Sequence, residues 1–333
     1  MGETERHLVT GGTGFLGRRL CQRLLDEGHA VRALCRRPDA ELSAAGVEVV
    51  VGDLADSDVV AAGCDGVDIV HHVAALAGIW GRYSDYWTTN VLGTLHVLRG
   101  CLRRGVGRLV YTSTPSVVFD GQDHRGADES LPYTPRFFTH YQKTKAAAER
   151  LVIEAAHRDE IRAVALRPHL IWGPGDRHLA PRLIDRARRG RLRRVGSADN
   201  LVGMCYVDNA AHAHILAARA LKTNPSISGR AFFITHAKPV ALWPWIDEIL
   251  SLADCPPVTR RISAGAAYRI GGLCEAAWKV MRLPGEPPMT RFIALQLSLS
   301  HYYNISAAQK DLGYEPIITK EEGMRRLAAS FSP

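Results

Sequence analysis

The first half of the chain alternates short apolar runs with longer segments in which apolar side chains recur every three or four positions. Apolar runs suit strands of a parallel sheet that is buried on both faces, and the longer spacing suits amphipathic helices. The alternation predicts an α/β fold of the Rossmann type, a doubly wound parallel sheet with helices on both faces. We expect strands at 7–10, 30–34, 47–51, 67–73, 108–113 and 162–166, and helices at 15–27, 84–103 and 141–157.

This alternation of strand-like and helix-like segments becomes less regular after about residue 167. Gly-Pro-Gly at 173–175 and a proline-rich stretch at 284–288 interrupt the second half, while a helix and a strand return within 207–235. The pattern predicts a smaller, discontinuous C-terminal substrate-binding domain beside the main one. The expected boundaries are 1–170 for the dinucleotide-binding domain, with 203–235 returning to it, and 171–202 with 236–333 for the substrate-binding portion.

A glycine-rich segment, TGGTGFLG at 10–17, lies between the first expected strand and the first expected helix. A glycine at the first position allows a tight turn, one at the second lets the backbone approach a pyrophosphate, and one at the third lets the helix pack closely on the sheet. Because strand, turn and helix agree, the segment predicts a dinucleotide site. The expected cofactor contacts here are Gly11, Gly14, Phe15, Leu16 and Gly17.

The end of the second strand carries Arg36 and Arg37 where an NAD-binding protein usually has an acidic residue. A guanidinium group suits the 2′-phosphate of NADP(H), so we expect NADP(H) to be preferred, with NAD(H) as the alternative if both arginines are merely solvated. Asp53 is placed to bind the adenine amino group, next to Leu54. Small side chains at Ala74 and Ala75 would let the cofactor lie close to the fourth strand.

Tyr141 and Lys145 are four residues apart, which on a helix places them on one face. A protonated Lys145 beside Tyr141 should lower the pKa of the phenol, so that Tyr141 can exchange a proton with a substrate oxygen near neutral pH. The hydroxyl-rich run Tyr-Thr-Ser-Thr at 111–114 ends the fifth strand and could bind the same oxygen. The four-residue spacing of tyrosine and lysine is weak evidence of a catalytic site by itself, and the hydroxyl run strengthens that evidence.

Together, TGGTGFLG, GDL at 52–54, YTST, YQKTK at 141–145 and RPHLIWGPGD at 167–176 resemble the extended short-chain dehydrogenase/reductases over nearly the whole chain. The resemblance implies that Thr114 is the catalytic hydroxyl, with Ser113 as the fallback. It also implies that Lys145 binds the nicotinamide ribose and that the backbone after Arg167 meets the carboxamide. Pro168 and Ile171 are accordingly expected at the cofactor.

Within that family the chain is most similar to the branch of 3β-hydroxysteroid dehydrogenases and sterol-4-carboxylate 3-dehydrogenases, and more narrowly to bacterial 2-alkyl-3-keto acid reductases of olefin biosynthesis. The residues behind the narrower likeness are GRLVYTSTPSV at 107–117, ALRPHLIWGPGD at 165–176, and AYRIGGLCE and GEPPMTRFIALQL within 267–297. Both branches act on a carboxylate one carbon from an alcohol or ketone, which implies a β-keto or β-hydroxy acid. We expect reduction, because the two arginines favour NADPH; oxidation of a sterol 3β-alcohol with loss of carbon dioxide is the alternative.

Two other functions remain open. A nucleotide-sugar epimerase or dehydratase would keep the glycine turn and the Tyr-Lys pair, but it needs a diphosphate clamp, which only the arginine-rich run at 182–194 could supply. A non-catalytic dinucleotide-binding module would keep the turn without turnover, and the intact Tyr141, Lys145 and Thr114 argue against it. The plainer interpretation of the arginine run is a solvated helix end and turn.

The 333-residue composition, with 46% hydrophobic and 23% charged residues, is typical of a globular protein and excludes disordered and fibrous classes. A net charge of +8 suits an acidic ligand, and no interleaved aromatic platform suggests nucleic acid. Seven scattered cysteines show no metal-site or disulfide spacing, so no metal is expected. No leader or membrane-spanning run is evident, and we expect a cytoplasmic protein, with peripheral membrane contact as an alternative.

The second half offers an apolar pocket for the substrate. The amphipathic pattern at 264–283 has Arg269, Lys279 and Arg282 on its polar side, and it predicts a lid or dimer helix, with a membrane-facing entrance as the alternative. We also expect a homodimer, since family members often pair through the helix of the Tyr-Lys motif, and contact with pathway enzymes is open. Candidate substrate contacts are Trp172, Trp278, Met281, Phe292 and Tyr302, while His71 and His72 are expected in the core.

Overall fold

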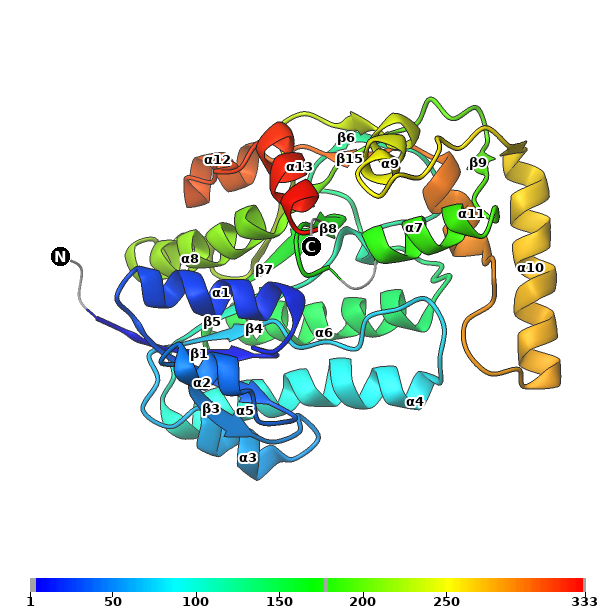
Figure 1. The fold of residues 1–333 in the computed structure, drawn as a ribbon. Coiled ribbons are helices and arrows are strands. Elements are labelled where there is room, and N and C mark those ends of the chain that lie inside the picture. Colours follow the sequence, from blue (N-terminus) through cyan, green and yellow to red (C-terminus); the bar gives the residue numbers. More distant parts are fainter. Residues whose placement is uncertain (1–3, 177–178, 332–333) are drawn as a thin grey trace.

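The computed structural model describes residues 4–176 and 179–331 and is built around a seven-stranded parallel sheet (Figure 1). Its strand order is β12-β7-β5-β4-β1-β2-β3. The strands are β1 (Arg6–Thr10), β2 (Ala30–Cys35), β3 (Glu48–Val51), β4 (Ile69–His72), β5 (Arg108–Thr112), β7 (Arg162–Pro168) and β12 (Arg230–Ile234). These are the expected strands to within a few residues, and the expected return of the second half to the sheet is β12, which pairs with β7.

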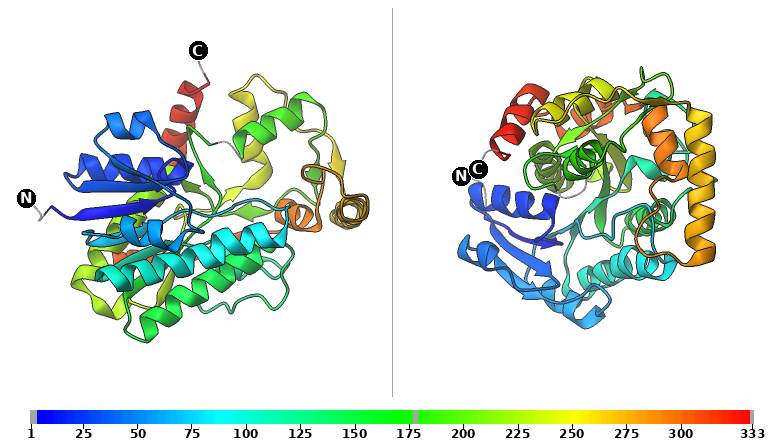
Figure 2. Two further views of the ribbon diagram at one scale, coloured as in Figure 1. Left: turned by 90° about the horizontal axis from the view of Figure 1, so that it is seen from below. Right: turned by 45° about the vertical axis from the view of Figure 1, so that its right-hand side comes forward.

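Helices cover both faces of this sheet, as Figures 1 and 2 show. On one face α1 (Phe15–Asp26) packs on α8 (Val207–Thr223). On the other, α5 (Gly93–Arg104) lies between α3 (Ser57–Gly63) and α6 (His140–His157). The arrangement confirms the doubly wound prediction.

The chain reverses its direction of strand addition between β1 and β4, because β2 and β3 are added on one side and β5, β7 and β12 on the other. Open α/β sheets bind ligands outside the carboxyl ends of the strands at such a reversal. The carboxyl ends of β1 and β4 are Thr10 and His72, which pair in the sheet and whose side chains are hydrogen-bonded at 2.8 Å. The topology therefore places a ligand site directly after these two strands.

The helix expected at 84–103 is interrupted by a wider turn. It begins as α4 (Tyr83–Tyr86), continues as a π-helix over Trp87–Leu92, and becomes α5 at Gly93. The buried Asn90 lies in the π-helix, where its side chain accepts from the Leu76 amide at 2.7 Å and donates to the Leu76 carbonyl at 3.1 Å. The Asn90 side chain thus holds the loop that follows β4, and π-helical turns are frequent at functional sites.

The C-terminal portion and the connections consist of shorter elements. The helices are α2 (Ala40–Ala44), α7 (Ala180–Arg188), α9 (Leu242–Ser251), α10 (Ala264–Met281), α11 (Arg291–Ser298), α12 (Ser306–Leu312) and α13 (Lys320–Ala329), with 3₁₀ turns at Pro115–Val117 and Pro225–Ile227. The strands are β6 (His124–Ala127), β8 (Ile171–Trp172), β9 (Arg194–Val195), β10 (Leu201–Val202), β11 (Cys205–Tyr206), β13 (Val240–Ala241), β14 (Arg261–Ile262) and β15 (His301–Tyr303). None of the helices in the described ranges has the length and apolarity to cross a bilayer.

Three expectations about side chains can be compared with the packing. Trp172 is a core residue rather than a substrate contact, because it is 1% exposed and packs edge-to-face on Trp245 at 5.6 Å. His71 and His72 are buried and hydrogen-bonded, as expected; the Nε2 atom of His71 lies 2.9 Å from Nδ1 of His7. The arginine run at 182–194 contains the end of α7 at Arg188, a turn and β9, in agreement with the interpretation as a helix end and turn.

Candidate active site

The glycine-rich turn at 10–17 is shaped by contacts that exclude side chains. Gly11 has a φ of +71°, and a Cβ there would lie 2.9 Å from the Cα of Ala74. A Cβ on Gly17 would lie 2.1 Å from the carbonyl oxygen of Gly11. Helix α1 begins at Phe15 with Gly14 as N-cap, and no side chain caps its first amides. These free N–H groups and the close backbone approach fit a pyrophosphate at the helix N-terminus.

We expect Gly17→Ala to lower the free energy of unfolding by about 1–3 kcal/mol and to weaken dinucleotide binding, because its methyl group must displace the Gly11 backbone. Calorimetric titration with the dinucleotide and urea unfolding measure the two effects. Gly265→Ala is the matched control, since a Cβ there meets nothing within 4 Å. Equal cofactor affinity in the two variants would contradict this account of the turn.

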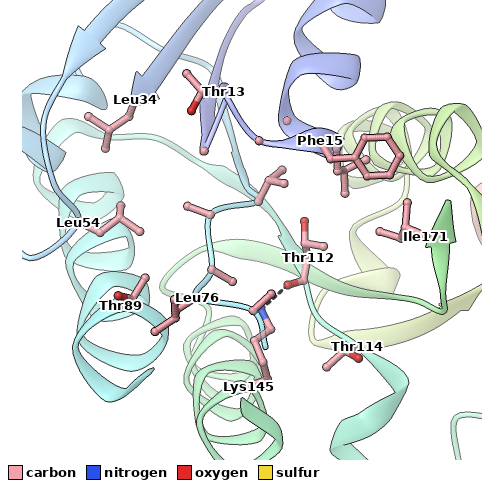
Figure 3. Close-up of a pocket in the computed structure, with 18 of the residues that line it drawn as sticks. Thr13, Phe15, Leu34, Leu54, Leu76, Thr89, Thr112, Thr114, Lys145 and Ile171 are labelled. Atoms are coloured by element: carbon pink, nitrogen blue, oxygen red, sulfur yellow. Dashed lines mark hydrogen bonds between the residues drawn. The ribbon is translucent and has the colours of Figure 1, made fainter. Parts of the chain in front are cut away.

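A cavity of about 490 Å³ runs from this turn across the carboxyl ends of the strands. It brings together every sequence-predicted cofactor and catalytic residue except Arg37, which is exposed and does not line it. Figure 3 shows Leu34, Leu54 and Thr89 on one side of this cavity and Phe15 and Ile171 on the other. Lining residues that the sequence analysis missed are Thr13, Leu34, Cys35, Gly52, Val73, Leu76, Ala77, Thr89 and Leu170.

Arg36 lies at the end of β2 with its side chain exposed and lines the cavity. Its guanidinium makes no hydrogen bond or ion pair with a residue in the described ranges. By contrast, the nearby Arg18 is bound to Asp39 and Glu41. Asp53 accepts from the Ala55 amide at 2.9 Å through one oxygen, which leaves the other available. Arg36 is therefore a cation available to a ligand anion at this end of the cavity.

Thr114, Tyr141 and Lys145 meet at the opposite end. Tyr141 and Lys145 come from the first two turns of α6, and Thr114 follows β5, where its side chain caps the 3₁₀ turn at Pro115–Val117. The Nζ atom of Lys145 donates to the carbonyl oxygen of Thr112 at 2.6 Å, the contact drawn in Figure 3. The Thr114 hydroxyl accepts from the Ser116 amide at 3.2 Å and lies 3.1 Å from the Ser116 hydroxyl. Ser113 also lines the cavity, and its buried hydroxyl has no partner within the described ranges.

The expected lowering of the Tyr141 pKa by Lys145 is wrong for this structure. Burial raises the pKa of Tyr141 to about 12, although the hydrogen bond from Thr114 acts in the opposite direction. Burial also lowers the pKa of Lys145 to about 7, and the Glu149 carboxylate partly opposes this change. Desolvation is the largest effect on both pKa values, and the buried Lys145 ammonium group is bound to a backbone carbonyl instead of the phenol.

A buried ion pair lies one helical turn beyond Lys145. Glu149 is fully buried and accepts from Nε of Arg167 at 3.1 Å and from its terminal nitrogen at 2.5 Å. The hydroxyl of Tyr133 donates to the same carboxylate at 2.8 Å. Sequence reasoning missed this group, although a carboxylate four residues after Lys145 was a readable signal. The pair joins α6 to β7, whose last residue, Pro168, lines the cavity.

A second, larger cavity of about 940 Å³ lies between the loop at 79–83, the chain at 137–143 and helix α10. The loop continues from Leu76 and Ala77, which line the first cavity, so one loop contributes residues to both cavities. Of the candidate substrate contacts, Trp278 lines this cavity, whereas Met281 is exposed. Phe292 packs edge-to-face on Phe119, and Tyr302 lines a separate cavity of about 230 Å³. The apolar lining of the second cavity is Ile79, Trp80, Phe137, Phe138, Ala276, Trp278 and Leu283.

Comparison with known proteins shows similarity to one family of oxidoreductases. The model of the 3-beta hydroxysteroid dehydrogenase/isomerase family matches residues 8–257. The 2-alkyl-3-oxoalkanoate reductase of Stenotrophomonas maltophilia (strain K279a) is 48% identical over 326 residues, which cover 97% of this chain and 98% of that one. The reductase of the same name from Shewanella oneidensis is 45% identical over 330 residues, covering 97% and 85%.

Proteins of lower sequence identity are also similar over nearly the whole chain. The 3 beta-hydroxysteroid dehydrogenase/Delta 5-->4-isomerase of Mycobacterium tuberculosis is 36% identical over 333 residues, covering 97% of this chain and 89% of that one. Among solved structures, MoeE5 in complex with UDP-glucose and NAD superposes with a TM-score of 0.74 at 25% identity and covers 98% of each chain. Similarity therefore includes the glycine turn, the Tyr-Lys helix and the C-terminal portion alike.

Proposed function

The chain belongs to the 3-beta hydroxysteroid dehydrogenase/isomerase family and is an NAD(P)-dependent oxidoreductase, and from this premise we propose that it reduces the ketone of a bulky 2-alkyl-3-keto acid to the 3-hydroxy acid with NADPH. The observation that carries the proposal is the 48% identity to a 2-alkyl-3-oxoalkanoate reductase over nearly the whole of both chains. The cavity that joins Thr114, Tyr141 and Lys145 supplies the groups that such a reduction needs.

The residues of the cavity have distinct roles in this proposal. A bound nicotinamide dinucleotide supplies the hydride, and the 10–17 turn, Lys145, Pro168 and Ile171 would hold it. Tyr141 carries its proton at neutral pH, because burial raises its pKa to about 12, and it gives that proton to the substrate oxygen. Thr114 lines the same cavity and would orient the same oxygen. Lys145, when protonated, stabilises the charge that develops on Tyr141 as the proton leaves.

The preference for NADPH is supported by Arg36. Its guanidinium lines the cavity and has no partner within the described ranges, so it can bind a 2′-phosphate.

We expect Arg36→Ser to lower kcat/KM with NADPH by about 10- to 100-fold and to change kcat/KM with NADH little, since a hydrogen bond to a charged group contributes roughly 1.5–3 kcal/mol. Arg37→Ser is the matched control. Equal losses with both cofactors would argue against a phosphate contact.

The second cavity suits the alkyl part of such a substrate. It is larger than the first cavity and has aromatic and aliphatic walls, and the loop at 76–83 contributes Leu76 and Ala77 to the first cavity and residues 79–83 to the second. We propose that an alkyl chain extends from the carbonyl at Tyr141 into this space. A sterol 3β-alcohol is the second candidate substrate, because the same walls suit a rigid apolar skeleton. The relative from Mycobacterium tuberculosis is named a 3 beta-hydroxysteroid dehydrogenase.

The proposal is tested by initial rates of NADPH and NADH oxidation with a 2-alkyl-3-keto acid, beside reduction of NAD+ and NADP+ with a sterol 3β-alcohol. Turnover of the keto acid with NADPH preferred is the expected result. Turnover of the sterol alone, with NAD+, would replace the proposal by the second candidate.

We also propose a homodimer. Trp87 on the π-helix and Leu102 on α5, beside α6, offer exposed apolar contacts for it. Light scattering on the same preparation tests this proposal.

A further inference from the structure

A line of buried histidines runs along one face of the sheet toward the first cavity. His7 lies on β1, His71 on β4 and His214 on α8, and each is buried. Nδ1 of His7 lies 2.9 Å from Nε2 of His71, and Nδ1 of His71 lies 3.4 Å from Nδ1 of His214. Nε2 of His214 lies 2.9 Å from the hydroxyl oxygen of Thr112. These four side chains form one continuous hydrogen-bonded chain.

The register of the sheet places this chain on the face that α1 and α8 cover. His71 pairs with Val9 of β1 and with Val110 of β5, and paired residues of parallel strands point to the same face. Because side chains alternate along a strand, His7 and Thr112, each two residues from those partners, point there too. His7 lies near the beginning of β1 and Thr112 ends β5, so the chain runs from the amino edge of the sheet to its carboxyl edge.

The two ends of the chain lie at the surface and at the first cavity. At the carboxyl edge Thr112 lines that cavity, and its carbonyl oxygen accepts from Nζ of Lys145 at 2.6 Å (Figure 3). At the amino edge the ring of the half-buried His29 lies 4.5 Å from that of His7, measured between centroids. Nε2 of His7, the nitrogen that His71 does not use, is buried without a hydrogen-bond partner in the described ranges. His29 is therefore the point at which solvent meets the chain.

A neutral imidazole has a hydrogen on one ring nitrogen and accepts at the other. Two arrangements therefore satisfy the chain: each ring donates toward Thr112, or each ring donates toward His7. A proton that arrives at His7 converts the first arrangement into the second, because each ring gains a proton on one nitrogen and releases that of the other. Burial lowers the pKa of His7 to about 4 and that of His214 to about 3, so at neutral pH no ring retains the added proton.

We propose that these histidines and Thr112 form a relay that carries protons from solvent to Tyr141. The inference rests on the proposed function, in which Tyr141 gives one proton to each ketone and must regain one. One proton enters at His7, and the hydroxyl of Thr112 releases one into the cavity, where water carries it to the phenolate of Tyr141. Ring reorientation then restores the first arrangement. Because the relay begins at the amino edge of the sheet, it can work while cofactor and substrate fill the cavity.

The first turnover separates the relay from the chemical step. Tyr141 already holds one proton, because burial raises its pKa to about 12, so a protein with a broken relay should reduce one ketone normally and then wait. In stopped-flow oxidation of NADPH with excess 2-alkyl-3-keto acid, we expect His214→Gln to consume one equivalent at the parent rate. Its steady rate should then be about tenfold or more below that of the parent. Heavy water should slow this steady phase further, which slow product release would not explain.

A second variant interrupts the chain at its last link. Thr112→Val removes the hydroxyl and keeps the carbonyl that binds Lys145, so it should show the same two phases, and Thr112→Ser should restore the steady rate. His301→Gln is the matched control. His301 is a buried histidine bonded to His169 at 2.6 Å, in a pair that ends at the carbonyl oxygen of Gln296 and lies outside the first cavity. It should show parent kinetics.

Nuclear magnetic resonance of the ring nitrogens in isotope-labelled histidine tests the chain without cofactor or turnover. Signals of His71 and His214 should lie between those of protonated and unprotonated nitrogens, as two exchanging arrangements require, and Thr112→Val should hold His214 in one arrangement. The relay is overturned if both rings are fixed in the parent, or if His214→Gln slows the first and later turnovers equally or slows neither. A parent protein that turns over no keto acid would count against the proposed function, and the nitrogen signals would then decide the relay.

Discussion

Tyr141→Phe is expected to lower kcat by about 10²- to 10⁴-fold while leaving dinucleotide affinity and thermal stability close to those of the parent. The substitution removes only the hydroxyl that carries the transferred proton and keeps the ring that fills the cavity wall. Burial raises the pKa of this hydroxyl to about 12, so at pH 7 it is neutral in the folded protein and its loss removes no charge. Thr114 still lines the cavity and keeps its hydrogen bond from the Ser116 amide.

Three measurements separate chemistry from folding in this variant. Single-turnover oxidation of NADPH reports the rate, dinucleotide titration reports cofactor binding, and thermal unfolding reports stability. Tyr268→Phe is the control, because Tyr268 is a half-buried tyrosine of α10 that lines neither large cavity. A Tyr141→Phe protein with full kcat would show that another group, with Ser113 as the first candidate, supplies the proton.

Glu149→Gln is expected to lower the free energy of unfolding by about 3–5 kcal/mol, because it leaves the Arg167 guanidinium buried without a counter-charge. Urea unfolding at pH 7 measures this loss. Adding Arg167→Met should restore part of the stability, since both buried charges are then absent. Glu154→Gln changes an exposed glutamate of the same helix and should cost little. A Glu149→Gln protein as stable as the parent would exclude a structural role for the pair.

The same variant should also shift the pH dependence of turnover. Burial lowers the pKa of Lys145 to about 7, and the Glu149 carboxylate acts against that decrease. Removing the carboxylate therefore lowers the pKa of Lys145 further, so Lys145 loses its proton at a lower pH. If protonated Lys145 supports proton transfer from Tyr141, the decline of kcat with rising pH begins earlier in Glu149→Gln than in the parent. An unchanged profile would show that the charge of Lys145 does not limit turnover.

The sequence by itself determined the sheet and the glycine-rich turn after its first strand. Apolar runs such as His7–Thr10 are local signals of buried parallel strands, and the spacing of Gly11, Gly14 and Gly17 is a local signal of a phosphate turn, because each depends on neighbours in the chain. The four-residue spacing of Tyr141 and Lys145 likewise placed both in one cavity. Local periodicity was misleading at 84–103, where a π-helical turn is held by the tertiary contacts of Asn90.

Only the tertiary structure decided how the groups of the site are charged and what surrounds them. The pKa values of Tyr141 and Lys145 depend on burial and on Thr112 and Glu149, whose positions relative to them the fold sets. Trp172 belongs to the core instead of the substrate pocket because it meets Trp245, which is 73 residues away in the chain. The exposure of Leu273 and Val280 follows from which side of α10 meets α11. Desolvation and contacts between distant segments cannot be read from residue spacing, since they arise only when the elements pack together.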